Sequence, residues 1–178
     1  DYVTIKSSFP PISNAGPDQN VTKNTLVTLD GSDSNDTESP TVTYMWSVNS
    51  KPIGSTITLS NITAERPTFT TDEAGVYLFD LVVNDGDVNS TIDTVNVYCY
   101  NRAPNANAGP DQNVSKSDTV TLSGLASNDP DLDELNYIWN MTSSPGGSVA
   151  SLSETNSSMP TFVADLEGSY TFNLIVND

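Results

Sequence analysis

Apolar and polar residues alternate along short segments of the chain, and turn residues separate one segment from the next. A period of two is typical of a β-strand with one buried face, and no stretch of useful length has the spacing of an amphipathic helix. The pattern therefore predicts an all-β fold in which antiparallel strands form two facing sheets. In the first half of the chain, the side chains expected between the sheets are Val27, Leu29, Tyr44, Trp46, Val48, Ile57, Leu59, Phe69, Tyr77, Phe79, Leu81, Val83, Val95, Val97 and Cys99.

The same pattern occurs twice, at an offset of 93 residues (44 to 137) that needs no insertion or deletion. Residues 44–46 (Tyr-Met-Trp) return as 137–139 (Tyr-Ile-Trp), and residues 15–21 return identically as 108–114. A repeat this regular predicts two small domains, each with its own core. The expected inner side chains of the second half are Val120, Leu122, Tyr137, Trp139, Met141, Val149, Leu152, Phe162, Tyr170, Phe172, Leu174 and Val176.

The repeat also predicts where the domains begin and end. Residues 1–5 have the pattern of residues 93–97, the last strand of the first unit, and Asp178 is the counterpart of Asp85. We expect residues 1–8 to be the closing strand of a preceding repeat or a donated strand, and residues 9–100 to be the first domain. Residues 101–107, stiffened by Pro104, would be the linker, and residues 108–178 a second domain that lacks its last strand. These predicted boundaries fit two explanations. The segment could be an excerpt of a longer tandem array, or the N-terminal strand of one chain could complete the second domain of another chain.

Charge and composition narrow the classes of partner. The chain has 23 acidic and 6 basic residues, a net charge of −17, which disfavours nucleic acids and anionic membranes and suits divalent cations or cationic polymers. It has no histidine and a single cysteine, Cys99, which excludes a Cys/His zinc site and a disulfide within the chain. Cys99 is expected to be a buried apolar residue, the alternative being an intermolecular disulfide. No stretch approaches the roughly 18 apolar residues of a membrane span, so this segment is not expected to insert into a membrane.

Several short motifs recur in both halves in the same order. They are Ala-Gly-Pro-Asp-Gln-x-Val, Val-Thr-Leu, Tyr-x-Trp, Leu-Ser, Pro-Thr-Phe, Gly-x-Tyr and Leu-x-Val-x-Asp. Together they resemble the PKD-type (polycystic kidney disease) domains, specifically the branch with Tyr-x-Trp on the central strand. The resemblance implies an immunoglobulin-like β-sandwich, an extracellular location and use as tandem spacers in surface-layer proteins, adhesins and secreted enzymes.

Acidic loops follow the second strand of each unit. Closely spaced carboxylate and amide oxygens are the ligands that calcium requires, although neither loop has EF-hand spacing. The resemblance to PKD-type domains implies calcium near the domain junction, with Asn14 and Asn107 as further contributors; the alternative is a solvated turn, and no cofactor is expected to be required. The candidate ligands are Asn128, Asp129, Asp131 and Asp133 in the second unit and Asp33 and Asp36 in the first.

Glycosylation is a second candidate chemistry. Seven Asn-x-Ser/Thr triplets begin at Asn20, Asn35, Asn61, Asn89, Asn113, Asn140 and Asn156. In a chain this rich in Asn, Ser and Thr, several such triplets arise by chance.

The aromatic pairs Trp46 with Tyr44 and Trp139 with Tyr137 are expected to form the core, because a small sandwich needs a large aromatic side chain at its centre. The alternative is a sugar-stacking platform. No catalytic residue is expected, since the recurring carboxylates Asp72 and Asp165 precede glycines where a turn role suffices.

The sequence therefore favours a non-catalytic structural repeat of an extracellular cell-surface protein, such as an S-layer, stalk, adhesin or filament protein. In this role it would act as a semi-rigid spacer beside neighbouring copies of the same repeat. One alternative is an accessory, polymer-binding or spacer module of a secreted hydrolase. Another is a filament subunit joined to the next by donated-strand complementation.

Overall fold

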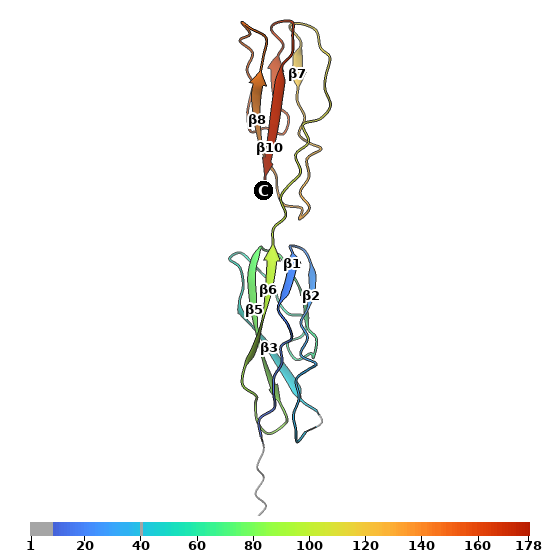
Figure 1. Cartoon of the computed structure of the whole chain (residues 1–178), viewed down its shortest axis with the longest axis vertical. Helices are drawn as coiled ribbons and strands as arrows, with labels where there is room; N and C mark the ends of the chain where they lie inside the picture. Colours follow the sequence, from blue (N-terminus) through green and yellow to red (C-terminus); the bar gives the residue numbers. More distant parts are fainter. Residues whose placement is uncertain (1–8, 40) are drawn as a thin grey trace, which may run out of the picture. The chain divides into compact units, whose positions relative to one another are not determined.

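The computed structural model describes residues 9–39 and 41–178, so the predicted strand at residues 1–8 lies outside the described residues. The chain divides into two compact units, Asp1–Asn101 and Arg102–Asp178 (Figure 1). Every regular element in the described ranges is a β-strand, which confirms the all-β prediction. No helix in the described part of the chain is long and apolar enough to cross a membrane.

Unit one is a sandwich of two sheets. The larger sheet has the order β1 (Gln19–Thr22), β6 (Asp93–Tyr100), β5 (Gly75–Asn84) and β3 (Thr43–Ser50). The smaller sheet pairs β2 (Leu26–Thr28) with β4 (Thr68–Thr70). The pairs are antiparallel except for β1, which runs parallel to β6 from Gln19↔Val97 to Thr22↔Tyr100.

The core of unit one follows from the alternation along β5 and β6. Tyr77 and Phe79 of β5 and Val97 of β6 are fully buried, while the intervening residues face outward. The rings of Tyr77 and Phe79 lie 5.5 and 4.8 Å from the ring of Phe69 in the facing sheet, at the tilted angles that aromatic pairs prefer. Cys99 is buried at the end of the same row.

Unit two repeats this arrangement with fewer strands. One sheet pairs β8 (Asn136–Ser143) with β10 (Thr171–Asn177), and the other pairs β7 (Thr119–Thr121) with β9 (Thr161–Val163). No described strand covers the second edge of β10, where β6 lies in unit one. Phe172 and Leu174 are consequently half-buried, whereas their counterparts Phe79 and Leu81 are fully buried.

Two predicted core residues lie outside the core. Val149 is 86% exposed, and Ala150 packs against the core in its place. The offset of 93 residues pairs Ala150 with the core residue Ile57 and Val149 with Thr56. Val48 is exposed because the pairing of β3 with β5 shifts register between Val48 and Ser50.

Candidate functional site

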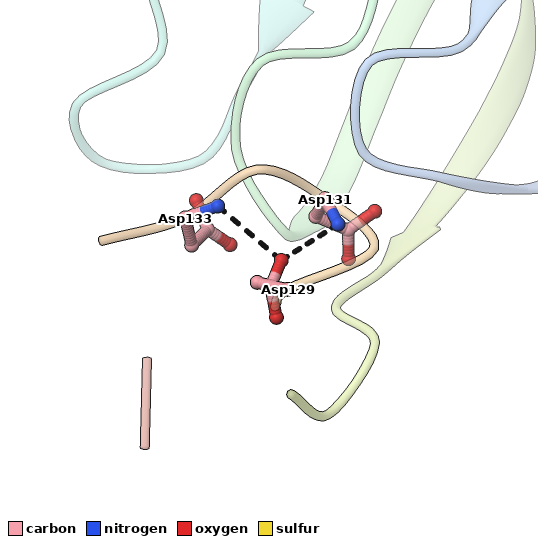
Figure 2. Close-up of side chains that lie close together, drawn as sticks. All are labelled: Asp129, Asp131 and Asp133. Carbon is pink, nitrogen blue, oxygen red and sulfur yellow. Dashed lines mark hydrogen bonds between the residues drawn. The ribbon is translucent and has the colours of Figure 1, made fainter. Parts of the chain in front are cut away.

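The acidic loop of unit two lies between β7 and β8. Asn105 and Asn128 exchange both backbone hydrogen bonds, which ties the loop to the segment that enters the unit. Asp129 then accepts, through Oδ1, the backbone N–H groups of Asp131 (2.6 Å) and Asp133 (3.3 Å) (Figure 2). An aspartate that accepts from the backbone two residues on is a common turn-forming device, which explains the Asp-x-Asp spacing.

Arg102 neutralises the most buried carboxylate of this loop. The backbone N–H of Arg102 donates to Asp131 Oδ2 (2.6 Å), and its Nε and Nη2 donate to Oδ1 (2.9 and 2.7 Å). Nη2 also donates to the carbonyl oxygen of Pro130 (2.7 Å). Asp131 is only 2% exposed, and a buried carboxylate needs such a charged, hydrogen-bonded partner.

Part of the predicted calcium set is brought together. Asp129, Asp131 and Asp133 each offer a ligand oxygen, and these oxygens lie within 4.8 Å of one another. Asp129 is 6% exposed, and its Oδ2 is a buried acceptor without a hydrogen-bond partner. The side chain of Asn128 is exposed, and Asn107 Oδ1 instead accepts the N–H of Gly109 (2.9 Å).

The fit to calcium is therefore partial. Calcium takes six to eight oxygen ligands, whereas both oxygens of Asp131 already accept hydrogen bonds from Arg102. If calcium bound here, the carboxylates of Asp129 and Asp133 would hold it, and it would cross-link the two ends of the turn.

Unit one carries a related loop without the guanidinium. Asp36, the counterpart of Asp129, accepts the N–H of Glu38 through Oδ1 (2.6 Å), and its Oδ2 is likewise buried without a partner. The N–H of Phe9 donates to Glu38 Oε2 (2.9 Å), just as the N–H of Arg102 donates to Asp131. Asp33 is exposed, and no three-carboxylate cluster forms in the described part of unit one.

Asp36 also lines a polar pocket of about 360 Å³ in unit one. Ser34, Tyr44 and Glu65 are among the other lining residues. Burial raises the pKa of the Tyr44 hydroxyl, and the negative charge of Glu65 raises it further.

Arg102 is a functional residue that no sequence motif predicted. Arg102 and Asp131 are 29 residues apart and belong to no shared motif. The available signal was a break in the repeat, since Phe9 stands at the position of Arg102 and Glu38 at that of Asp131.

The two tryptophans lie in the cores. Trp46 and Trp139 are each 1% exposed, and their Nε1 atoms donate to the carbonyl oxygens of Ala64 and Ser157, both at 3.1 Å. Tyr44 and Tyr137 are half-buried against the same cores. Buried indole rings cannot stack on a sugar, so they do not form a platform.

The carboxylates of Asp72 and Asp165 serve as loop anchors. Burial of Asp72 opposes its ionisation, but hydrogen bonds from Ser55, Thr56 and Tyr77 outweigh this and lower its pKa to about 2. Hydrogen bonds from Ser148, then from the Val149 N–H and Tyr170, lower the pKa of Asp165 to about 2. Both groups are therefore ionised acceptors near neutral pH.

Both units match the same family of domains. A family model described as "K319L-like, PKD domain" matches residues 15–99 and 108–178, one match in each unit. The chain belongs to this PKD domain family. The Tyr-x-Trp segments of β3 and β8 lie within the matched ranges.

The relatives of these PKD domains are much longer proteins. The chain is 31% identical over 175 residues to the dyslexia-associated protein KIAA0319-like protein of Mus musculus, and 29% identical over 175 residues to dyslexia-associated protein KIAA0319 of Homo sapiens. Each match covers 96% of this chain but only 16% of the relative. The solution structure of the PKD domain from KIAA 1837 protein has 30% identity and a TM-score of 0.45, covering 61% of this chain and 99% of that domain.

All seven sequon asparagines of the two PKD domains are exposed, namely Asn20, Asn35, Asn61, Asn89, Asn113, Asn140 and Asn156. Some of their side chains already have partners. Asn20 Oδ1 accepts the Tyr100 hydroxyl (2.9 Å), and Asn61 Oδ1 accepts both the N–H and the hydroxyl of Thr63 (3.0 and 2.9 Å).

Proposed function

We propose that the chain is a non-catalytic structural segment of an extracellular, cell-surface protein, in which two PKD domains act as a spacer. The observation that carries the proposal is the repetition of one aromatic-centred PKD sandwich in each half of the chain. The anchoring carboxylates of Asp72 and Asp165 support a structural role. Their pKa of about 2 lies far from neutral pH, whereas efficient proton transfer needs a pKa near the working pH. The exposed sequons support an extracellular location, and the spacer role suits a stalk, adhesin, S-layer or filament.

The connection between the units supports a semi-rigid spacer. Strand β6 of unit one ends at Tyr100, and Arg102 is already bound within unit two through Asp131. Only Asn101 separates these two anchored residues. A connection this short restricts bending far more than a flexible linker does.

Small-angle scattering tests the spacer role. We expect the pair-distance distribution of the wild-type chain to contain a distinct second maximum from distances between units. A variant with a Gly-Ser-Gly-Ser-Gly insertion after Asn101 should lose this maximum, because its units move independently. An insertion of the same length in the exposed turn after Gly86 is the matched control and should retain it. Identical distributions for the wild type and the Asn101 insertion would refute the semi-rigid spacer.

The second edge of β10, which no strand of the described residues covers, favours a second candidate function, assembly by donated-strand complementation. In unit one, β6 covers the equivalent edge of β5 from Gly75↔Cys99 to Leu81↔Asp93. In unit two, the half-buried Phe172 and Leu174 lie along an edge that no described strand covers. An unpaired edge of this kind binds further strands readily.

A deletion and a peptide test strand donation. Removal of residues 1–6 should abolish self-assembly of the chain while unit one stays folded. A peptide with the sequence of residues 93–100 and serine at position 99 should bind the chain and protect the β10 backbone from hydrogen exchange. A scrambled peptide is the control. Assembly that persists after the deletion, or equal protection by both peptides, would exclude this mode of association.

A further inference from the structure

We propose that the Arg102 guanidinium is the built-in cation of the unit-two acidic loop and that it competes with calcium for the carboxylates of this loop. Throughout, the unit-two acidic loop means residues 128–134. The inference concerns cation binding within one unit and stands whether or not the chain is a spacer.

The Arg102 guanidinium contacts two acceptor oxygens of the loop. Arg102 Nη2 lies 2.7 Å from both Asp131 Oδ1 and the Pro130 carbonyl oxygen, and Nε lies 2.9 Å from the same Oδ1. A carboxylate oxygen beside a backbone carbonyl oxygen is also a typical pair of calcium ligands. Arg102 therefore occupies oxygens that a divalent cation would need.

One carboxylate oxygen of the loop is left without a hydrogen-bond partner. Ligand oxygens of Asp129, Asp131 and Asp133 lie within 4.8 Å of one another, and Arg102 forms its ion pair with Asp131 of this cluster. Asp129 Oδ2 is buried and has no hydrogen-bond donor. One positive charge satisfies Asp131 but leaves this oxygen without a partner, whereas a divalent ion carries enough charge for more than one carboxylate.

The two units make the same backbone contact at this position, but only unit two has an arginine there. Unit one keeps the backbone part of the arrangement, with the Phe9 N–H on Glu38, but has no guanidinium at this position. The backbone contact is thus compatible with the fold without the arginine side chain. The backbone N–H of residue 102 would still reach Asp131 Oδ2 in a variant that lacks the guanidinium.

The test is calcium titration of the complete chain after chelator treatment. Isothermal calorimetry and thermal unfolding would compare the wild type with Arg102→Gln at an ionic strength near 0.15 M, where distant charges are largely screened. We expect Arg102→Gln to bind calcium at least about tenfold more tightly than the wild type, because the competing cation is gone. Its unfolding temperature should fall in EDTA and recover in calcium, while that of the wild type should change little.

Arg66→Gln is the matched control. It removes the same charge from the other arginine of the chain, which pairs with the half-exposed Asp30 in unit one (3.0 Å). Arg102→Lys retains a charge but lacks the planar fork, and should bind calcium with intermediate affinity. Asp129→Asn in the Arg102→Gln background should return calcium affinity to the wild-type level.

Three results would overturn the proposal. In the first, Arg66→Gln raises calcium affinity as much as Arg102→Gln. In the second, the wild type binds calcium as tightly as Arg102→Gln does. In the third, Arg102→Gln loses the fold of unit two and calcium does not restore it.

Discussion

Asp72 and Asp165 act at the scale of single residues, each closing the same loop in its own unit. Ser55 Oγ and Tyr77 Oη donate to Asp72 Oδ1 at 2.6 and 2.9 Å. Ser148 and Tyr170 make the same contacts to Asp165 at 2.6 and 2.8 Å. The tyrosine hydroxyl also lies 2.7 Å from the Glu73 carbonyl oxygen, so one buried phenol joins the carboxylate to the backbone of the turn. The arrangement resembles the tyrosine corner of immunoglobulin-like domains.

These anchors predict a specific acid sensitivity. The pKa of Asp72 is about 2 in the folded chain and 3.8 as its ordinary value, so the carboxylate stabilises the fold above about pH 4. This stabilisation should disappear as the pH falls from 3.8 towards 2. We expect Asp72→Asn to lower the free energy of unfolding by about 1 kcal/mol at pH 7, after allowance for solvent screening, and to flatten its decline between pH 4 and 2.

Urea denaturation of the wild type and the variant at several pH values measures this difference. Asp87→Asn, at an exposed turn position, is the control and should leave the free energy of unfolding at pH 7 close to that of the wild type. If the free energy of unfolding of Asp72→Asn declined between pH 4 and 2 as steeply as that of the wild type, the Asp72 carboxylate would not be an anchor.

At the scale of the element, β5 and β10 show one strand pattern in two environments. β5 is paired on both edges, by β3 and β6, whereas β10 is paired only with β8 among the described strands. Phe79 and Phe172 contact equivalent rings, at centroid distances of 4.8 Å from Phe69 and 4.7 Å from Phe162. The two phenylalanines therefore differ in the strand beside them and not in the ring they face.

This difference predicts that replacing phenylalanine by alanine lowers the stability of the two units by unequal amounts. Phe79→Ala should destabilise unit one by about 3–5 kcal/mol, the usual cost of emptying a fully buried aromatic site. Phe172→Ala should destabilise unit two by roughly half as much, because its side chain is half in solvent and removes less surface from water. Hydrogen exchange followed by mass spectrometry separates the two units. Equal losses of protection would mean that the edge of β10 has no energetic consequence in this chain.

At the scale of the whole molecule, the surface is acidic and rich in sequons. The net charge of −17 disfavours non-specific association between copies of the chain, and exposed glycans would add to that effect. The sequons are distributed over both units, with Asn61 on a loop of unit one and Asn156 on a loop of unit two.

We therefore predict glycan at two or more of the seven sequons when the chain is secreted from mammalian cells. Treatment with a glycosidase that removes N-linked glycans should lower the mass by at least two core glycans. Asn61→Gln and Thr63→Ala should each remove the same glycan, since both destroy one sequon. A secreted chain whose mass is unchanged by the enzyme would contradict this prediction.

Much of the fold was predictable because its cause is local. Alternation along the strands specified the buried faces, and the offset of 93 residues placed one aromatic-centred unit in each half. The Val149 assignment was wrong because it followed strand alternation into a loop, which has no fixed period; the offset of 93 residues pairs Ala150, not Val149, with the core residue Ile57.

The sequence alone determined the fold class, the repeat and the residue types of the acidic loops. Folding pairs the Arg102 guanidinium with the Asp131 carboxylate and buries one oxygen of Asp129 without a donor. Ion pairing acts between side chains that folding brings together, and its partners here are 29 residues apart with no periodic relation. The half-burial of Phe172 likewise depends on which strand lies beside β10, a property of sheet pairing that no local pattern encodes.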